Sequence, residues 1–295
     1  MKDRALAGVA YGLAAYGMWG FFPIFFRQLG HLRPMDVLCH RAAWCCVFVA
    51  LLITAGRRWH KVQAVLPRPR QLLLLATAAW LVGSNWLIFL YALDQRQVIA
   101  SSLGYFVTPL FNIALGMLVL KERLNGKEWA AVALAVVAVA IELVTLGSLP
   151  WISLALAITF GLYGLVRKQV PVDAVSGLWL ETLAMLPVAL LYAVWQAQAG
   201  HAVFSGHDTP TVLLLVVAGI LTALPLMAFA AATQRLNLAT VGMLMYINPT
   251  MQFVTAVWIF GEALQPARVL TFGLIWVGLA IYSWAAWEKY RRNVE

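Results

Sequence analysis

A series of long apolar runs, one after another along almost the whole chain, restricts the fold of this protein most strongly. A membrane-spanning helix needs about 20 mainly apolar residues. By this rule we expect ten spans, at 5–26, 35–55, 71–93, 98–120, 128–147, 150–166, 176–196, 211–233, 239–260 and 267–287. With 63% hydrophobic and 11% charged residues, the chain lacks the polar surface of a soluble protein. The sequence therefore predicts an all-α polytopic membrane protein with a single integral domain over residues 1–295.

The positive charges predict how the chain is oriented. With a cytoplasmic N-terminus, sixteen of the 21 Lys and Arg residues fall on the cytoplasmic side and four on the opposite side, while Arg41 lies inside a span. Cytoplasmic loops of membrane proteins carry such an excess of positive charge. The net charge of +9 therefore reflects orientation in the membrane, and we expect no nucleic acid as a partner. We predict a multi-pass protein of the bacterial inner (plasma) membrane with both termini in the cytoplasm.

A proline motif occurs twice at corresponding places in the chain. Pro109 lies midway along its span and Glu122 follows that span, and 140 residues later Pro249 and Glu262 stand in the same relation. Both residue types are scarce here, so the coincidence indicates an internal repeat of five helices. The two copies are residues 1–147 and 148–295. Because five is an odd number, the second copy enters the membrane from the other side, and we expect ten transmembrane helices as two inverted five-helix repeats.

Polar side chains around the two prolines are candidate substrate-binding groups. A proline inside a helix frees the carbonyl about four residues earlier, and in a membrane this group must be satisfied by protein or by a water-filled cavity. The polar residues are Tyr105, Thr108 and Asn112 in the first copy and Asn248 and Gln252 in the second. We expect them to line a midplane cavity, with Pro109 and Pro249 as hinges. The alternative role is hydrogen bonding between helices.

Three further candidates lie in other spans. Asn85 matches Pro225 at the repeat spacing, and Trp19 matches Tyr163 at a spacing of 144 residues. We expect Asn85 to line the same cavity and the two aromatic residues to form part of its wall. The alternative for Trp19 and Tyr163 is ordinary packing or a place in the interfacial aromatic belt.

A charge inside a span is costly, so Arg41 needs a role. Glu181 stands at the equivalent position of the second repeat, but its expected depth differs and we expect no direct salt bridge between the two. Two interpretations of Arg41 remain. One is structural, through pairing with Glu142 or snorkelling to the interface. The other is attraction of an anionic substrate group by the fixed charge and fork of the guanidinium.

Glu122 and Glu262 end their spans at opposite faces of the membrane. A carboxylate at the C-terminal end of a helix opposes the helix dipole, which indicates that each accepts hydrogen bonds from loop or helix-start amides. We therefore expect gate or anchor roles for both.

Nothing in the sequence indicates a metal, a cofactor or a catalytic centre. Cys39, Cys45 and Cys46 share one apolar run without a further soft ligand nearby, so packing is their expected role. The chain contains no Gly-x-Ser-x-Gly, His-Glu-x-x-His or Gly-x-x-x-x-Gly-Lys motif. We expect no metal, no cofactor and no catalytic residue. The alternatives to transport are an intramembrane enzyme and a non-transporting structural or sensory subunit.

Seven segments carry a resemblance to a known family. They are YGMWGFFP at 16–23, HR at 40–41, SNW at 84–86, ASSLGYF through Pro109 at 100–109, KERL at 121–124, LWLET at 178–182 and FGE at 260–262. In these segments, and over nearly its whole length, the chain resembles the RarD family within the EamA-type branch of the drug/metabolite transporter superfamily. The resemblance implies ten helices in two inverted repeats and a permease, of a group often labelled chloramphenicol-sensitivity or resistance permeases.

The chain departs from one related group. Small multidrug pumps couple protons through an acid in their first helix, whereas spans 5–26 and 150–166 contain no carboxylate here. Polycation–proton antiport by that mechanism is therefore not expected. We predict a secondary transporter that exports a small metabolite, an amino-acid-like solute or a drug by alternating access. Its expected partners are the small-molecule substrate and the lipid bilayer, and small residues in spans 128–147 and 267–287 also permit a homodimer.

Overall fold

The computed structural model describes residues 2–94, 98–146, 151–206, 208–259 and 266–292. Every regular element in these ranges is a helix. In chain order the elements are α1 (Lys2–Gly20), α2 (Phe22–Phe26), the 3₁₀ turn η1 (Arg27–Leu29), α3 (Pro34–Ala55), α4 (Trp59–Gln63), α5 (Pro69–Asp94), α6 (Val98–Leu118), α7 (Gly126–Leu146), α8 (Trp151–Gln169), α9 (Ala174–Gln198), α10 (Thr209–Thr233), α11 (Leu238–Met245), α12 (Ile247–Trp258) and α13 (Pro266–Arg292). Within the described ranges, eight segments are long and apolar enough to cross a membrane, and a shorter apolar helix covers Leu103–Leu118. The protein is therefore an all-α polytopic membrane protein.

Several helices begin at residues that satisfy their free amide groups. Before α7, the Asn125 amide donates to Glu128 Oε2 at 2.7 Å and the Glu128 amide donates to Asn125 Oδ1 at 2.9 Å, which is a capping box. Before α9, Asp173 Oδ1 accepts from the Ser176 amide at 3.2 Å. Pro34 opens α3, where its missing N–H costs nothing. These local signals fix the register at which each apolar run enters the bundle.

The two proline-containing spans differ in their backbones. The expected span 239–260 is divided at Tyr246 into α11 and α12, three residues before Pro249. By contrast, α6 continues through Pro109 without such a break. The first span is also interrupted, because α1 ends at Gly20 and α2 begins at Phe22. The eight segments long enough to cross a membrane correspond to eight of the ten expected spans. The expected span 98–120 contains the shorter apolar helix Leu103–Leu118, and 239–260 contains the two short helices α11 and α12.

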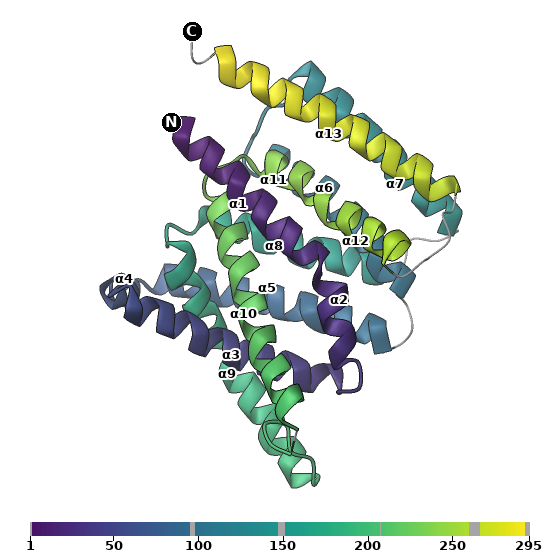
Figure 1. Ribbon diagram of the computed structural model, residues 1–295. Coiled ribbons are helices and arrows are strands. Elements are labelled where there is room, and N and C mark those ends of the chain that lie inside the picture. The colour runs from purple at the N-terminus through teal and green to yellow at the C-terminus, as the bar shows by residue number, and fades with distance from the viewer. Residues whose placement is uncertain (1, 95–97, 147–150, 207, 260–265, 293–295) are drawn as a thin grey trace.

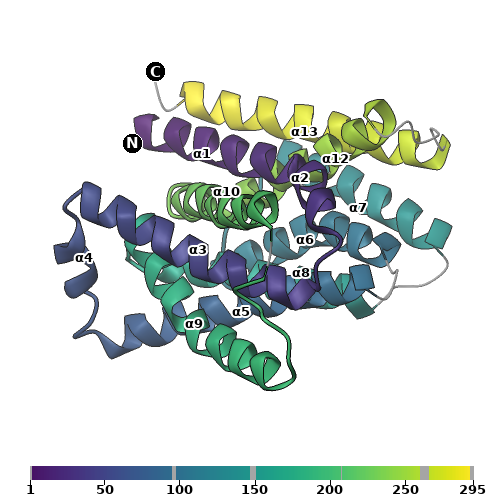
Figure 2. The same cartoon turned by 60° about the horizontal axis from the view of Figure 1, so that its bottom comes forward.

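The packing of the helices has a regular pattern (Figures 1 and 2). In Figure 1, α7 and α13 run side by side along one edge of the bundle, and α3, α4 and α9 lie towards the opposite edge. Between them, α1 packs against α10 and α12, while α8 packs against α5 and α6. The pairs α3 with α9 and α6 with α11 also pack together. At the repeat spacing α1 corresponds to α8, α5 to α10, and α6 to α11 and α12. The contacts follow the same correspondence, because α1 packs against α10 as α8 packs against α5, and α1 packs against α12 as α8 packs against α6.

Two glycines bring helices close together in equivalent ways. A methyl group added to Gly20 in α1 would overlap the Met251 side chain in α12, and one added to Gly161 in α8 would overlap the Phe111 ring in α6. Met251 and Phe111 lie 140 residues apart in the sequence, and the two glycines lie 141 apart. The close crossing of α1 with α12 therefore has a counterpart in the crossing of α8 with α6.

Large apolar side chains cover much of the outer surface of the bundle. Leu118 is 78% exposed, Val144 is 81% exposed and Trp258 is 82% exposed. Such side chains are stable against lipid tails and would not be stable in water. The polar residues that the sequence singled out lie instead between the helices.

Candidate functional site

The polar residues around the prolines lie where α6 meets α11 and α12. Thr108 and Asn112 in α6 are buried, as is Asn248 in α12. Asn112 Nδ2 lies 4.0 Å from Met245 Sδ in α11, so the two proline segments are in contact. The Asn112 side-chain oxygen is buried without a hydrogen-bond partner. A buried amide oxygen without a donor costs about 1–3 kcal/mol, which marks this position as unusual.

The other polar groups of these segments form hydrogen bonds along their own helices or between helices. Thr108 Oγ1 donates to the Gly104 carbonyl at 2.6 Å, and Gln252 Nε2 donates to Asn248 Oδ1 at 3.0 Å. The Tyr246 hydroxyl, at the break between α11 and α12, donates to the Phe106 carbonyl at 3.2 Å. Thr108 and Gln252 therefore bond within their own helices and only Tyr246 connects two helices, while the role of these polar residues as a cavity lining stays a prediction.

Asn85 connects α5 to α8. Its Nδ2 donates to the Leu156 carbonyl and to Thr159 Oγ1, both at 2.9 Å. The Thr159 hydroxyl in turn donates to the Ala155 carbonyl at 2.6 Å. The Asn85 side chain therefore points between α5 and α8, towards the inside of the bundle.

Trp19 and Tyr163 lie in one aromatic cluster at the centre of the bundle. The Trp19 ring lies 5.6 Å from the Phe160 ring and 5.8 Å from the Phe229 ring. Tyr163 stacks on Phe229 with ring centroids 5.6 Å apart. The two residues that the repeat pairs in sequence are therefore joined in space through Phe160 and Phe229, which belong to α8 and α10.

Arg41 reaches the middle of the bundle. Its Nε donates to Thr222 Oγ1 at 3.0 Å, and Thr222 lies halfway along α10. The guanidinium carbon lies 4.3 Å from the centroid of the Trp86 ring and 4.9 Å from that of Phe26. The side chain is only 7% exposed. The expected structural pairing with Glu142 is wrong, because no described carboxylate lies within salt-bridge distance of Arg41.

A buried ion pair that the sequence did not predict lies between α8 and α9. Arg167 Nη1 is 3.1 Å from Glu181 Oε1, and the two side chains are 0% and 1% exposed. The Tyr163 hydroxyl donates to Glu181 Oε2 at 3.3 Å. The sequence does contain a signal for this pair. Arg167 stands at the end of one apolar run and Glu181 stands inside the next, and the short loop between the runs makes them neighbouring antiparallel helices.

Glu122 anchors the start of α11. Its Oε1 accepts from the Leu238 amide at 2.7 Å and its Oε2 accepts from the Ala239 amide at 3.0 Å. The Lys168 ammonium lies 3.9 Å from Glu122 Oε1. These contacts agree with the expected bonding of the carboxylate to helix-start amides and with the dipole of α11. Its role as a gate stays a prediction, and Glu262 lies outside the described residues.

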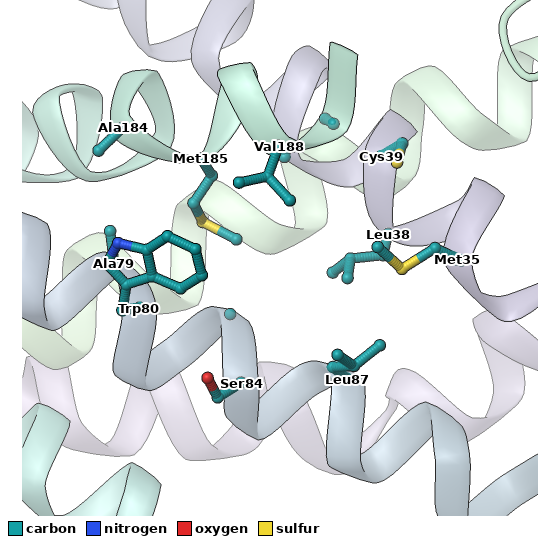
Figure 3. Close-up of a pocket in the computed structure, with 13 residues that line it drawn as sticks. Met35, Leu38, Cys39, Ala79, Trp80, Ser84, Leu87, Ala184, Met185 and Val188 are labelled. Atoms are coloured by element: carbon teal, nitrogen blue, oxygen red, sulfur yellow. The ribbon is translucent and has the colours of Figure 1, made fainter. Parts of the chain in front are cut away.

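A pocket of about 100 Å³ lies between α3, α5 and α9 (Figure 3). Met35, Leu38 and Cys39 line it from α3, Trp80 and Ser84 from α5, and Met185 and Val188 from α9. Trp80, Leu87 and Val188 in its lining are among the exposed apolar residues, so the pocket reaches the outer surface of the bundle. None of the polar residues that the sequence singled out lines this pocket. Its apolar lining is suited to hydrocarbon rather than to a polar solute.

The described part of the chain shows no group of three or more His, Cys, Asp or Glu side chains that could hold a metal ion. The arrangement offers a different kind of chemistry. At Arg41 a buried positive charge lies against two aromatic rings, which suits non-covalent binding of a small molecule.

Comparisons with known proteins agree with a membrane transporter fold. Residues 6–144 match the EamA-like transporter family. An "Uncharacterized transporter" of Vibrio cholerae is 45% identical over 282 residues, which cover 96% of this chain and 93% of that protein. "Protein RarD" of Escherichia coli is 40% identical over 286 residues, or 97% of each chain. A crystal structure with 17% identity superimposes with a TM-score of 0.76 and covers 96% of this chain and 99% of that one, which shows a shared fold.

Proposed function

Since the chain belongs to the RarD family of EamA-type transporters, we propose that it is a secondary transporter whose two halves alternate access to a central site. The solute is a small metabolite, an amino-acid-like compound or a drug, and export is the direction that the family resemblance favours. The Vibrio cholerae relative and the matching family model carry transporter names, and transport rather than catalysis is the function proposed for this chain.

The exchange of helix contacts between the halves is the observation that carries the proposal. The contact of α1 with α10 corresponds to that of α8 with α5, and the pairs α3 with α9, α6 with α11 and α7 with α13 join equivalent helices. Such a pattern supports two inverted five-helix repeats, 1–147 and 148–295, that are related by an axis in the membrane plane. The broken helix at Tyr246 supports a site near this axis, since interrupted helices form the binding sites of many secondary transporters.

The two glycine crossings supply a mechanism for alternation. With cytoplasmic termini, the crossing of Gly20 with Met251 lies towards the outer face, and that of Gly161 with Phe111 lies towards the cytoplasmic face. Opening the site to one face then requires separation at one crossing while the other stays closed. The protein sits in the bacterial inner membrane, and the small residues of α7 and α13 also permit a homodimer contact.

Transport in proteoliposomes tests the proposed function. The purified protein is reconstituted into liposomes, and the liposomes are loaded with labelled metabolites. Movement of each solute, with and without a pH gradient, is compared with its movement in protein-free liposomes. We expect at least one small solute to cross only in the presence of the protein. If no solute crosses under any condition while a compound is chemically converted, the protein is an intramembrane enzyme and the proposal is wrong.

The glycine crossings allow a sharper test with a matched control. Gly20→Ala places a methyl group against Met251, whereas Gly17→Ala, three residues earlier on α1, meets no atom within 4 Å. We expect Gly20→Ala to slow transport by about tenfold, because a close crossing that overpacks by one methyl costs about 1–3 kcal/mol. Gly17→Ala should transport at the wild-type rate. Equal rates for the two variants would mean that this crossing does not close during the cycle.

A further inference from the structure

Arg41 carries a buried charge that the protein itself does not neutralise. Its Nε donates to Thr222, and the N–H groups on Nη1 and Nη2 have no acceptor among the described residues. No described carboxylate lies within salt-bridge distance. A charged side chain within the membrane costs several kcal/mol, and Arg side chains there are normally paired. Snorkelling does not apply, because Thr222 lies at the middle of α10 and not at the membrane interface.

The equivalent position in the second half is different. Glu181, which matches Arg41 at the repeat spacing, is closed off by Arg167 and by the Tyr163 hydroxyl. That pair is sealed inside the protein at 0% and 1% exposure, whereas Arg41 retains 7%. The Arg167 N–H groups form no hydrogen bond either, but they have a carboxylate 3.1 Å away. The difference between the halves is therefore the counter-charge: Glu181 has one built in, whereas Arg41 has none among the described residues.

We propose that Arg41 binds the carboxylate of the transported solute, which makes the substrate class small organic monocarboxylates with an apolar or aromatic body. This inference rests on the proposed function. The two free Nη groups form the planar fork that matches a carboxylate in a bidentate manner. A single uncompensated positive charge selects a single negative charge, because a second anionic group would find no partner at this place.

The surroundings of Arg41 define the rest of the ligand. The Trp86 and Phe26 rings lie against the guanidinium, and the Tyr105 phenol is within its electrostatic range. Trp86, Tyr105 and Trp19 also pack against the same hydrophobic core. The Trp86 and Phe26 rings hold the guanidinium in place through cation–π contact, and Trp19 and Tyr105 offer further flat apolar surface for the body of the solute. Trp86 thereby becomes a positioning residue for the Arg41 fork.

Binding to the purified protein tests the inference separately from transport. Thermal shift is measured with a panel of short-chain and aromatic carboxylates, each beside its own amide and amine, for example phenylacetate, phenylacetamide and phenethylamine. Three variants are compared with the wild type. Arg41→Gln removes the charge, and Arg41→Lys keeps the charge without the fork. Arg33→Gln removes a partly exposed charge just before the same helix, where Arg33 pairs with Asp36 at 2.9 Å.

We expect stabilisation by carboxylates and not by their amides or amines. The apparent affinity should fall about 10- to 100-fold in Arg41→Gln, since charge-assisted hydrogen bonds are lost, and by less in Arg41→Lys. Arg33→Gln should bind like the wild type. The inference is overturned if no carboxylate in the panel binds, if amides or amines bind equally well, or if Arg41→Gln keeps the wild-type affinity.

The two proposals fail in distinguishable ways. The carboxylates that bind are then tested for movement in proteoliposomes. If they bind through Arg41 but neither they nor any other solute crosses, the site exists and the transporter proposal is wrong. If other solutes cross while carboxylates do not bind, the protein is a transporter and the assignment of Arg41 is wrong.

Discussion

The buried pair of Arg167 and Glu181 gives a stability prediction that can be worked out from its geometry. Glu181→Gln keeps the shape of the side chain and removes its charge, which leaves the Arg167 guanidinium buried without an anion. At the observed separation of 3.1 Å, the Coulomb attraction is about 5 kcal/mol with an effective dielectric constant of about 20. Removing one partner of such a pair costs about 3–5 kcal/mol in other proteins. We therefore expect Glu181→Gln to lower the free energy of unfolding by about 3–5 kcal/mol.

The double variant separates a paired charge from mere packing. Arg167→Met combined with Glu181→Leu removes both charges and refills the space with apolar atoms, which in other buried pairs is nearly neutral. We expect this double variant to be more stable than either Arg167→Met or Glu181→Gln alone. The measurement is unfolding in mixed micelles, followed by the loss of helical circular dichroism and extrapolated linearly to zero denaturant.

Lys127 and Glu288 provide the matched control. Their atoms are closer, at 2.6 Å, but the side chains are 52% and 27% exposed. An exposed pair contributes only about 0–1 kcal/mol, so Glu288→Gln should change stability very little. If Glu181→Gln costs no more than Glu288→Gln, or if the double variant loses as much as the two single losses together, burial of the pair does not govern its energy and the reasoning is refuted.

Two further predictions concern the anchor and the proline segments. Glu122→Ala removes the acceptor of two amides at the start of α11 and should lower the free energy of unfolding by about 0.5–2 kcal/mol, with a smaller loss for Glu122→Gln. If Glu122→Ala is as stable as the wild type in the same unfolding assay, water replaces the carboxylate. Asn112→Ala and Gln252→Ala should each lower transport in proteoliposomes by about tenfold with normal membrane insertion, as expected for the loss of a hydrogen bond to the solute. Full activity of both variants would contradict the cavity assignment.

The spans were predictable because a membrane leaves an apolar run of this length few alternatives. Backbone polar groups must bond within the segment, so each run becomes a helix whose length follows the bilayer. The break at Tyr246 was less accessible to sequence reasoning. Pro249 and Pro109 each remove one backbone hydrogen bond, yet only the helix that contains Pro249 is divided. Whether a proline interrupts its helix depends on the contacts that the helix makes with its neighbours, and these contacts cannot be read from the sequence alone.

The charge pairs were missed for two physical reasons. The sequence places the end of the sixth span at residue 166 and Arg167 in a loop, but α8 continues to Gln169 and draws Arg167 between helices. For Arg41, depth alone favoured Glu142 as the partner in the structural interpretation, which was one of the two interpretations that the sequence left open. A long side chain reaches several ångströms from its backbone, and the rotation of α3 about its axis directs it to Thr222 instead. Depth is readable from an apolar run, whereas rotation depends on the tertiary fold.

The carboxylate of Glu122 at the start of α11 has a consequence for the order of assembly. Glu122 precedes Leu238 by 116 residues, so the carboxylate that accepts these hydrogen bonds is synthesised well before the amides that donate them. Because chains are synthesised from the N-terminus, the first half can fold first and present this carboxylate as a preformed binding site for the start of α11 in the second half. A second half produced alone would begin α11 without this acceptor for its two amides, and residues 1–147 would have to be added to supply it.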